Sequence, residues 1–436
     1  MTELLPVLTL IGGLLFGLLT GFPMAFTLAS SAIVTAFFFF GPQTLPFVAT
    51  NIFGMMSGMV LIAMPLFVFM ACLLEKSGVA EDLYAFMYQA LGPVRGGLAM
   101  GTVLICAIIA AMSGVTTTAV VTMGIIALPI MLKQGYHKSI AIGPILAGGA
   151  LGLLIPPSVS LIVYGMVARV SIGKLFAGGV APGLILVGSF LTYIAIRSFL
   201  QPNYAPALPK EERVSLKELF FLSKGLILPI SVVALVLGTI FAGIASPTEA
   251  AAVGVAGAMI SALINRRLTW ALLNEAAVRS MAITGMVMWI LFGAACFTSI
   301  FFRTGGQDMI ADLLMGFENP ALIFGFILAV LIVLGFFLDE ITQVMITVPV
   351  FLPIIVQLGY DPVWFGVLFM TQVQMDYLTP PFGFTLFYMK GVAPPEVSMG
   401  DIYRSILPFV LIQLAVVIFI LLYPGVVMWL PNLLFG

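Results

Sequence analysis

Two Pro-Pro pairs inside long apolar segments constrain this chain more than any other feature of its sequence. They lie in the stretches 154–158 and 378–382, and Pro157 and Pro381 are separated by 381 − 157 = 224 residues. Other matching residues obey the same offset: Pro129 and Pro353, Gly135-Tyr136 and Gly359-Tyr360, and Tyr164 and Tyr388. The offset predicts a duplicated unit, and the prolines predict a broken helix at the matching place in each copy.

The composition restricts the chain to one class of protein. It is 62% hydrophobic and 8% charged, with a mean hydropathy of +1.21. So few charges cannot cover a water-soluble protein of 436 residues, so the sequence predicts a multi-pass membrane protein. The net charge of −1 leaves no basic surface for nucleic acid. The three cysteines lie in apolar runs and are predicted to be core residues.

The apolar runs predict an all-α architecture of about ten full spans with one re-entrant hairpin in each repeat. Three runs are short for a span: 97–112, 118–132 and 343–357. Two longer runs, 140–168 and 363–388, are interrupted by the Pro-Pro pairs. Because non-helical backbone at membrane depth must lie inside protein or beside water, these segments predict two hairpins and two broken helices.

The polar segment between the copies divides the chain. We predict a first repeat over 1–200, a linker with a short interfacial helix over 201–224, and a second repeat over 225–436. Basic residues in the linker and in the loop around Arg266 and Arg267 place both segments in the cytoplasm. Ser246, Pro247 and Glu249 have the pattern of a capped helix start.

The two breaks are the first candidate binding elements. Proline disfavours helix before it, so carbonyls of 153–155 and 375–379 should lose helical partners and become available to a sodium ion. A new half-helix begins at Ser158 or Phe382, and its positive end would attract a carboxylate. The simpler alternative is that each Pro-Pro pair only kinks a packed helix.

Polar residues between the short runs are the second candidate. Ser113 and Thr116 belong to a stretch of four hydroxyls and a glycine over 113–118, and hydroxyl oxygens suit a small hard cation. Asp339 and Glu340 occupy the matching place in the second copy, where carboxylates need a partner, an ion or water. The alternatives are hydroxyls bonded back to helix carbonyls, and a simple acidic loop.

Single polar residues complete the candidates. Asp376 lies within a spanning run and could bind a cation, carry a proton or pair with Lys390. His137, the only histidine, lies beside Lys138 and is predicted to be a loop residue. No motif for ATP hydrolysis or hydrolytic catalysis is present in the sequence, so the chain is predicted not to be an enzyme.

Five segments in order resemble the large membrane subunit of the tripartite ATP-independent periplasmic (TRAP) transporters, the DctM family. They are 113–114, 152–158, 171–176, 246–251 and 378–383, and the similarity covers essentially the whole chain. The resemblance implies an inverted-repeat, elevator-type fold in the bacterial inner membrane. It also implies sodium-driven uptake of small carboxylates, a small four-helix membrane subunit and a periplasmic substrate-binding protein as partners, and no cofactor beyond sodium.

The resemblance also implies positions for the ions and the substrate. The first sodium site would use Ser113, Thr116, Gly152, Ile155 and Pro157, and the second Asp339, Thr342, Thr379 and Pro381. The candidate substrate contacts are Ser158, Asp376, Phe382 and Lys390. Val115 departs from the family pattern, which often has a serine there, and could ligate only through its carbonyl.

Three other functions fit parts of the pattern. A stand-alone sodium–dicarboxylate symporter would need no binding protein. An intramembrane enzyme could use Asp339 and Asp376 as an acid pair, although the repeats should hold these residues on different helices. A scaffold without transport would leave costly buried polar groups without a purpose.

Overall fold

A computed structural model describes residues 4–114, 116–317, 319–380 and 383–436, and these residues form helices, turns and loops without strands. The first half contains α1 (Leu4–Thr20), α2 (Met24–Phe40), α3 (Leu45–Met56), α4 (Ala63–Lys76), α5 (Val79–Leu91), α6 (Gly97–Ser113), α7 (Thr116–Lys133), α8 (Lys138–Ala150), α9 (Val159–Ala168) and α10 (Ile172–Leu200). The second half contains α11 (Leu216–Phe241), α12 (Pro247–Ile264), α13 (Trp270–Arg303), α14 (Gly306–Met315), α15 (Pro320–Gly335), α16 (Glu340–Gln357), α17 (Pro362–Asp376), α18 (Phe384–Val392), α19 (Met399–Leu422) and α20 (Gly425–Phe435).

The offset of 224 residues relates the helices of the two halves. Adding 224 to 116–133, the bounds of α7, gives 340–357, the bounds of α16. The same addition carries α6 to α15, α8 to α17, α9 to α18 and α10 to α19 within a few residues. The duplication seen in scattered residues is therefore a duplication of helices, including both hairpins and both broken helices.

The two repeats are inverted with respect to each other. The start of α6 and the end of α7 both lie at the linker, where the Gly96 amide donates to Ala205 O (3.0 Å) and Gln134 Nε2 donates to Glu212 Oε2 (3.1 Å). The open end of the second hairpin lies at the other face, because the Tyr360 ring after α16 stacks on Trp364, which bonds Ile420 at the far end of α19. The hairpins thus enter from opposite faces.

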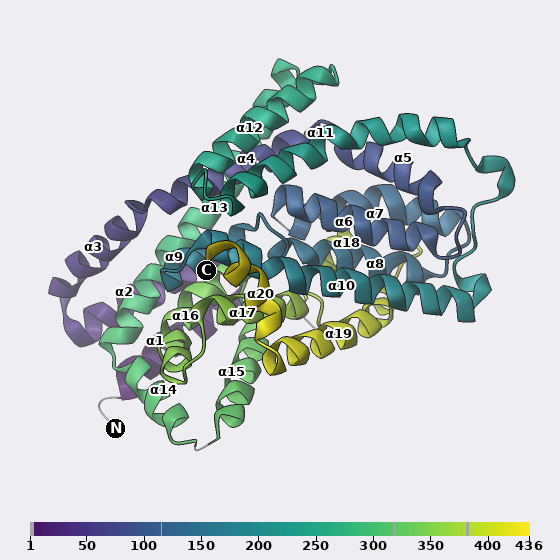
Figure 1. Ribbon diagram of the computed structural model, residues 1–436. Coiled ribbons are helices and arrows are strands. Elements are labelled where there is room, and N and C mark those ends of the chain that lie inside the picture. Colours follow the sequence, from purple (N-terminus) through teal and green to yellow (C-terminus); the bar gives the residue numbers. More distant parts are fainter. Residues whose placement is uncertain (1–3, 115, 318, 381–382) are drawn as a thin grey trace.

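Helix contacts repeat reciprocally across the two halves. α7 packs against α18 as α16 packs against α9, and α8 packs against α19 as α17 packs against α10. α4 contacts α12 as α13 contacts α2. In Figure 1, α6–α10 and α16–α19 gather around the breaks, while α1–α4 and α11–α13 lie along another flank. We call the first group, with α15, the core and the second group, with α5 and α14, the scaffold.

Some parts of the fold have no counterpart in the other repeat. α20 packs on α10, and the matching segment of the first repeat is the linker with its short turns η4 (Pro202–Tyr204) and η5 (Lys210–Glu212). The predicted interfacial helix is the first part of α11, which bends by 40° between Ser223 and Gly225. The end of the linker and the following span are thus one continuous helix.

Several local predictions are confirmed. Ser246 and Glu249 form a capping box at the start of α12. His137 lies in a loop, caps α8 through Ser139 N (3.3 Å) and stacks on Tyr204. Cys72, Cys106 and Cys296 are buried free thiols.

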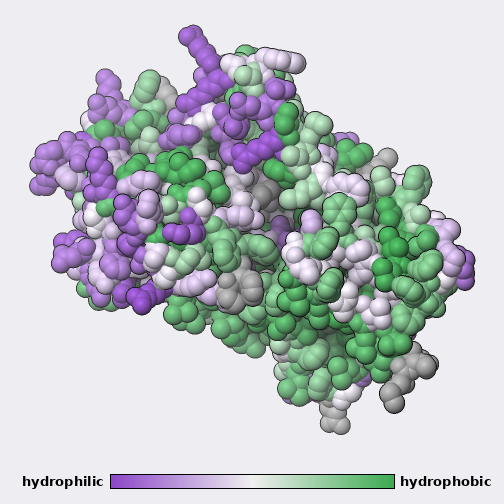
Figure 2. Space-filling view, turned by 180° about the vertical axis from the view of Figure 1, so that it is seen from behind, coloured by the Kyte–Doolittle hydropathy of each residue, from purple (hydrophilic) through white to green (hydrophobic). Residues whose placement is uncertain are grey.

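The surface matches a membrane environment. Six helices are long and apolar enough to cross a bilayer, or eight if each bent pair forms one span. Two of the six, α7 and α16, are arms of the hairpins. α1 and α2, with 17 residues each, are shorter apolar helices and are not among the six. Figure 2 shows a broad hydrophobic surface, with hydrophilic residues gathered mainly at the upper left of the view. That region corresponds to the linker side of Figure 1.

The charges orient the protein. Of the 17 Lys and Arg residues, only Arg169, Lys174 and Arg303 lie on the face opposite the linker, which leaves 17 − 3 = 14 toward the linker. Four of those toward the linker form ion pairs in the described part of the chain, among them Arg267 with Asp82 (2.8 Å) and Arg279 with Glu75 (2.7 Å). The positive-inside rule therefore places the linker face in the cytoplasm.

We expect Glu211→Cys to react with a membrane-impermeant maleimide only from the cytoplasmic side, and Asp308→Cys only from the periplasmic side. Both residues are exposed, at the linker and in α14 respectively, and the native thiols are buried. Labelling of intact cells and of inverted vesicles measures the difference. Reaction of both cysteines from one side would contradict the proposed orientation.

Candidate functional site

The tip of the first hairpin packs directly on the first break. α6 ends at Ser113, and Gly114 adopts a left-handed conformation (φ 60°) that turns the chain toward α7. A Cβ atom at Gly114 would lie 2.7 Å from Pro157 O and 3.2 Å from Val159 N. Because only glycine avoids both the strain and the clash, this residue allows backbone-to-backbone contact between tip and break. Val115 lies outside the described residues.

The first break is more fully hydrogen-bonded than the sequence predicts. The amides of Leu154 and Ile155 donate to Leu151 O (3.0 and 2.8 Å), and Ser158 Oγ donates to Leu153 O (2.8 Å). The prediction that Leu153 has a free carbonyl is therefore wrong, because the Ser158 hydroxyl replaces the missing helical donor. Ser158 also caps α9 by accepting from Leu161 N (3.4 Å).

Other predicted ligands lie beside this contact. Gly152 and Pro157 are buried, and Ile155 is half-buried near Gly183. Thr116, at the start of α7, is buried, and its Oγ1 has no hydrogen-bond partner among the described residues. Ser113 is buried at the end of α6. The tip and the break thus bring the five candidates for the first ion site into one region.

The second break also satisfies its own carbonyls. Met375 O accepts from Thr379 Oγ1 (2.7 Å), and Asp376 O accepts from Thr379 N (3.1 Å). Tyr377 O accepts from Thr385 Oγ1 (2.6 Å), and Thr379 O accepts from Gly383 N (3.0 Å). The prediction of free carbonyls at these positions is wrong, because threonine hydroxyls and turn amides take the place of helical donors. Pro381 and Phe382 lie outside the described residues.

The tip of the second hairpin carries the carboxylates. Asp339 caps α16: its Oδ1 accepts from Ile341 N (3.1 Å) and Thr342 N (3.0 Å), and its Oδ2 accepts from Thr342 Oγ1 (2.7 Å). Glu340 accepts a hydrogen bond from the Tyr377 hydroxyl, which joins this tip to the second break. Asp339 is thus a structural cap whose carboxylate also faces a cavity.

That cavity has a volume of about 240 Å³, and residues of both tips and both breaks line it. Scaffold helix α13 closes it with four apolar side chains, and Val68 of α4 adds another. Its lining residues are Val68, Gly114, Thr116, Thr117, Val159, Ile283, Met286, Val287, Ile290, Asp339, Glu340, Ile341, Tyr377, Phe384 and Tyr388. We call this space the inner cavity.

The charged side chains in the described lining of the inner cavity are all acidic. Its described lining contains two carboxylates, two tyrosine hydroxyls and two threonine hydroxyls, but no lysine, arginine or histidine. A small anion placed here would face Asp339 and Glu340 without a protein cation to offset them. The start of α9 at Val159 supplies only partial positive charge. The described lining therefore offers a cation two carboxylates, and offers an anion no basic side chain.

Three predicted substrate contacts do not line the inner cavity. Ser158 is fully buried behind Val159, where it caps α9. Asp376 is also fully buried: its Oδ1 accepts from Gln372 Nε2 (2.8 Å), and its Oδ2 lies against Gly335. Asp339 and Asp376 therefore have separate partners and do not form an acid pair. The third, Lys390, lies at the linker face.

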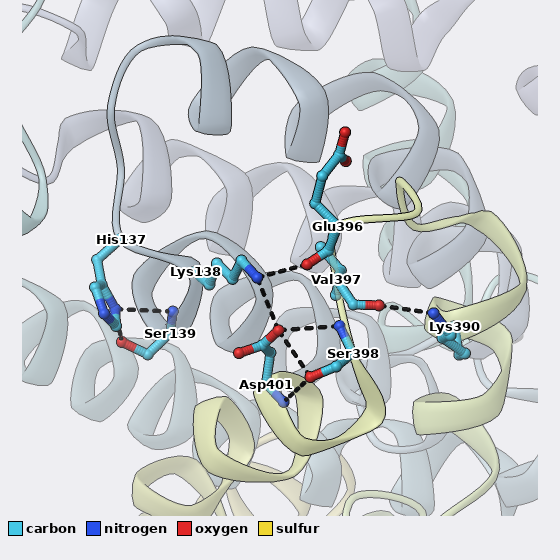
Figure 3. Close-up of polar contacts among 8 residues, drawn as sticks. All are labelled: His137, Lys138, Ser139, Lys390, Glu396, Val397, Ser398 and Asp401. Carbon is cyan, nitrogen blue, oxygen red and sulfur yellow. Dashed lines mark hydrogen bonds and ion pairs between the residues drawn. The ribbon is translucent and has the colours of Figure 1, made fainter.

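The surroundings of Lys390 belong to a cytoplasmic polar cluster. Lys390 Nζ donates to Val397 O (2.7 Å), while Lys138 Nζ pairs with Asp401 (2.9 Å) and also donates to Glu396 O (2.5 Å), as Figure 3 shows. These bonds fasten the loop after α18 to the starts of α8 and α19. Lys390 thus pairs with a loop carbonyl and not with Asp376.

Sequence reasoning missed part of the cavity wall. The four α13 side chains are not distinguished by any motif, because apolar residues at helical spacing occur throughout the chain. Thr117 belongs to the predicted hydroxyl stretch 113–118 and Tyr377 to the predicted carbonyl run 375–379, but neither side chain was singled out. Tyr388 was noticed only as one member of an offset pair with Tyr164.

Comparison with known proteins gives consistent matches. The family described as "Tripartite ATP-independent periplasmic transporter, DctM component" matches residues 11–426. The C4-dicarboxylate TRAP transporter large permease protein of Pseudomonas aeruginosa is 31% identical over 90% of this chain and 91% of its own length. The ectoine/5-hydroxyectoine TRAP transporter large permease protein of Ruegeria pomeroyi is 31% identical over 96% and 97%. The crystal structure of the Alcanivorax borkumensis YdaH transporter shares the fold with a TM-score of 0.62, at 17% identity over 90% of each chain.

We expect Gly114→Ala to lower uptake by roughly tenfold or more, because strain and the clash with Pro157 O would separate tip from break. Gly188→Ala is the matched control, since nothing lies within 4 Å of a Cβ there and its backbone is ordinary helix. Uptake per inserted protein measures the effect. Equal uptake by both variants would show that the close approach is dispensable.

Proposed function

Because the chain belongs to the DctM family of tripartite ATP-independent periplasmic transporters, we propose that it imports a small organic acid anion together with sodium ions. The family consists of transporters and not enzymes, and the chain is a multi-pass protein of the inner membrane. The observation that carries the proposal is the inner cavity, whose described lining holds two carboxylates and no basic side chain.

The cavity limits the substrate to a compact molecule. Its volume of about 240 Å³ lies below the common range for drug-sized ligands, so an anion with few carbon atoms fits best. Hydroxyls of Thr117 and Tyr388 could donate to its oxygens, whereas the Tyr377 hydroxyl already donates to Glu340. The positive end of α9 would favour one carboxylate. Sodium ions would neutralise the two acids and allow the anion to enter.

Two sodium sites are proposed at the two tip–break contacts. The first uses Ser113, Thr116, Gly152, Ile155 and Pro157, and the unpartnered buried Oγ1 of Thr116 supports it, because such an atom in an apolar interior gains from a ligand. The second uses Asp339, Thr342, Thr379 and Pro381, and the carboxylate of Asp339 would supply its negative charge. Both sites consist of oxygen donors, which hard cations prefer.

Alternating access would follow from movement of the core past the scaffold, as in an elevator. The contact between them at the inner cavity is formed by apolar side chains of α13 on the scaffold side. These side chains make no directional bonds that sliding would have to break, although farther along α13 the Thr298 hydroxyl donates to Met345 O of α16 (3.1 Å). The proposed partners are the small four-helix membrane subunit and a periplasmic binding protein that delivers the anion.

The first test is uptake of labelled carboxylates into proteoliposomes that contain this chain and its small subunit. We expect uptake only when an inward sodium gradient and the binding protein are both present. Uptake with sodium alone would assign the chain to stand-alone symporters. Uptake driven equally well by a potassium gradient would contradict sodium coupling.

The second test addresses one ligand. We expect Thr116→Val to raise the sodium concentration for half-maximal uptake by roughly tenfold, since it removes an oxygen ligand without changing side-chain volume much. Thr116→Ser retains the hydroxyl and should remain close to the unchanged protein. An unaltered sodium dependence in a correctly inserted Thr116→Val variant would remove Thr116 from the site.

A further inference from the structure

A second and larger cavity lies on the face opposite the linker. Its volume is about 1080 Å³, and we call it the outer cavity. Its walls come from α3 and α13 of the scaffold and from α9 and α16 of the core. It is lined by Phe47, Thr50, Asn51, Gly54, Met55, Gly58, Met166, Val167, Arg169, Ala295, Thr298, Ser299, Phe302, Arg303, Met345 and Pro349.

The outer cavity contains two of the three basic residues on its face of the protein. The positive-inside rule depletes Lys and Arg from the periplasmic side, and only Arg169, Lys174 and Arg303 lie there. Arg169 ends α9 in a left-handed conformation (φ 55°), and Arg303 is the last residue of α13. They come from opposite bodies, one from the core and one from the scaffold.

Neither arginine is neutralised by an acid in the described part of the chain. Neither takes part in any of the four ion pairs found there, whereas Arg267 and Arg279 at the linker face do. The guanidinium of Arg303 lies 5.2 Å from the Phe40 ring centre and 5.9 Å from that of Phe47. These rings hold the cation in place without cancelling its charge. Among the residues that the structure describes, no acid lines the cavity.

Polar groups without charge complete the walls. Asn51 Nδ2 donates to Ser299 Oγ (3.1 Å), which links α3 to α13 inside the cavity. The Thr50 hydroxyl bonds back to its own helix at Pro46 O (2.9 Å). The Thr298 and Ser299 hydroxyls also donate to backbone carbonyls, at Met345 O (3.1 Å) and Ala295 O (2.7 Å). The donors left for a carboxylate are therefore the two guanidinium groups and the second amide hydrogen of Asn51.

The outer and inner cavities share three helices. On α13 the inner lining ends at Ile290 and the outer lining begins at Ala295, about 8 Å farther along the helix at 1.5 Å per residue. On α16 Ile341 lines the inner cavity and Met345, one turn on, lines the outer. α9 contributes Val159 to the inner and Met166 to the outer cavity. The two cavities therefore lie one after the other along the same boundary between core and scaffold.

From these contacts we propose that the outer cavity is a first anion-binding site, where a carboxylate lies between Arg169 and Arg303 before it reaches the inner cavity. The proposal rests on the proposed function for its substrate class. The two sites have opposite electrostatics. The outer one holds an anion without sodium because the protein supplies the cations, while the inner one holds it only with a co-bound cation.

Cysteine protection tests the outer site without a transport assay. In a background with Cys72, Cys106 and Cys296 replaced by alanine, Thr50→Cys places one thiol in the cavity wall. Membrane vesicles with the periplasmic face outward, carrying this chain and its small subunit, are labelled with an impermeant maleimide in sodium-free choline buffer. The probes are succinate, N-acetylneuraminate and the neutral polyol xylitol.

We expect at least one of the two anions, but not xylitol, to slow labelling. Arg169→Asn with Arg303→Gln should weaken that protection by about tenfold or more, because charge-assisted bonds are lost. Asn tolerates the left-handed backbone at position 169. Lys174→Gln, the third cation of this face outside the cavity lining, should leave protection unchanged and is the matched control.

Several outcomes would overturn the proposal. One is protection by neither anion, and another is protection that survives loss of both arginines. Protection only by the binding protein or by an acidic peptide would instead make this face a docking surface for protein. If the double variant fails to insert, the single Arg303→Lys and Arg303→Gln variants keep the test decisive, since only the second should lose protection. Because sodium is absent, failure here is distinguishable from failure of sodium-coupled uptake.

Discussion

Helix breaks deep inside an apolar protein must find hydrogen-bond partners, and the architecture around the centre of this protein follows from that requirement. Each break is covered by a hairpin tip: Gly114 permits the first tip to reach Pro157, and Glu340 joins the second tip to Tyr377. Hydroxyls of Ser158, Thr379 and Thr385 satisfy three of the freed carbonyls, and backbone amides satisfy those of Asp376 and Thr379. Irregular backbone can persist at this depth because it is buried in protein or lines the inner cavity.

Because the two repeats are inverted, both tip–break contacts border the inner cavity. Because the hairpins enter from opposite faces, their tips line one cavity, and α13 closes it. The sign of the charged side chains then changes from the outer to the inner cavity along the boundary between core and scaffold. The outer cavity has basic residues and no acids, while the inner cavity has acids and no basic residues among the residues described. In the proposed mechanism, a carboxylate would meet protein cations in the outer cavity first and would depend on a mobile cation in the inner cavity.

Much of this fold can be predicted from the sequence. The offset between Pro157 and Pro381 predicts the duplication, the short runs predict the hairpins, and the Pro-Pro pairs predict the breaks. These features depend on residues close together in sequence, where proline chemistry and segment length decide the outcome. For the same reason, the sequence predicts that Asp339 belongs to a hairpin tip.

Other features depend on tertiary contacts that a sequence pattern does not encode. The hydroxyl that satisfies Tyr377 O comes from Thr385, beyond the break, so the carbonyl looks free when only local helix rules are applied. Lys390 looks like a partner for Asp376 because both lie in polar interruptions of apolar segments, but the chain carries it to the linker face. Arg169 and Arg303 line the same cavity only because α9 and α13 end at the same face.

The central claim is that anion and cation occupy the inner cavity together, and equilibrium binding tests it most directly. Labelled substrate, identified from the uptake panel, would be titrated onto the purified complex in nanodiscs at fixed ionic strength, with choline replacing sodium, in the Arg169→Asn, Arg303→Gln background that removes the proposed outer site. Joint binding predicts that affinity rises steeply with sodium and that binding is nearly lost without it. Equal affinity in sodium and in choline would contradict the claim, because the anion would then be held by the protein alone.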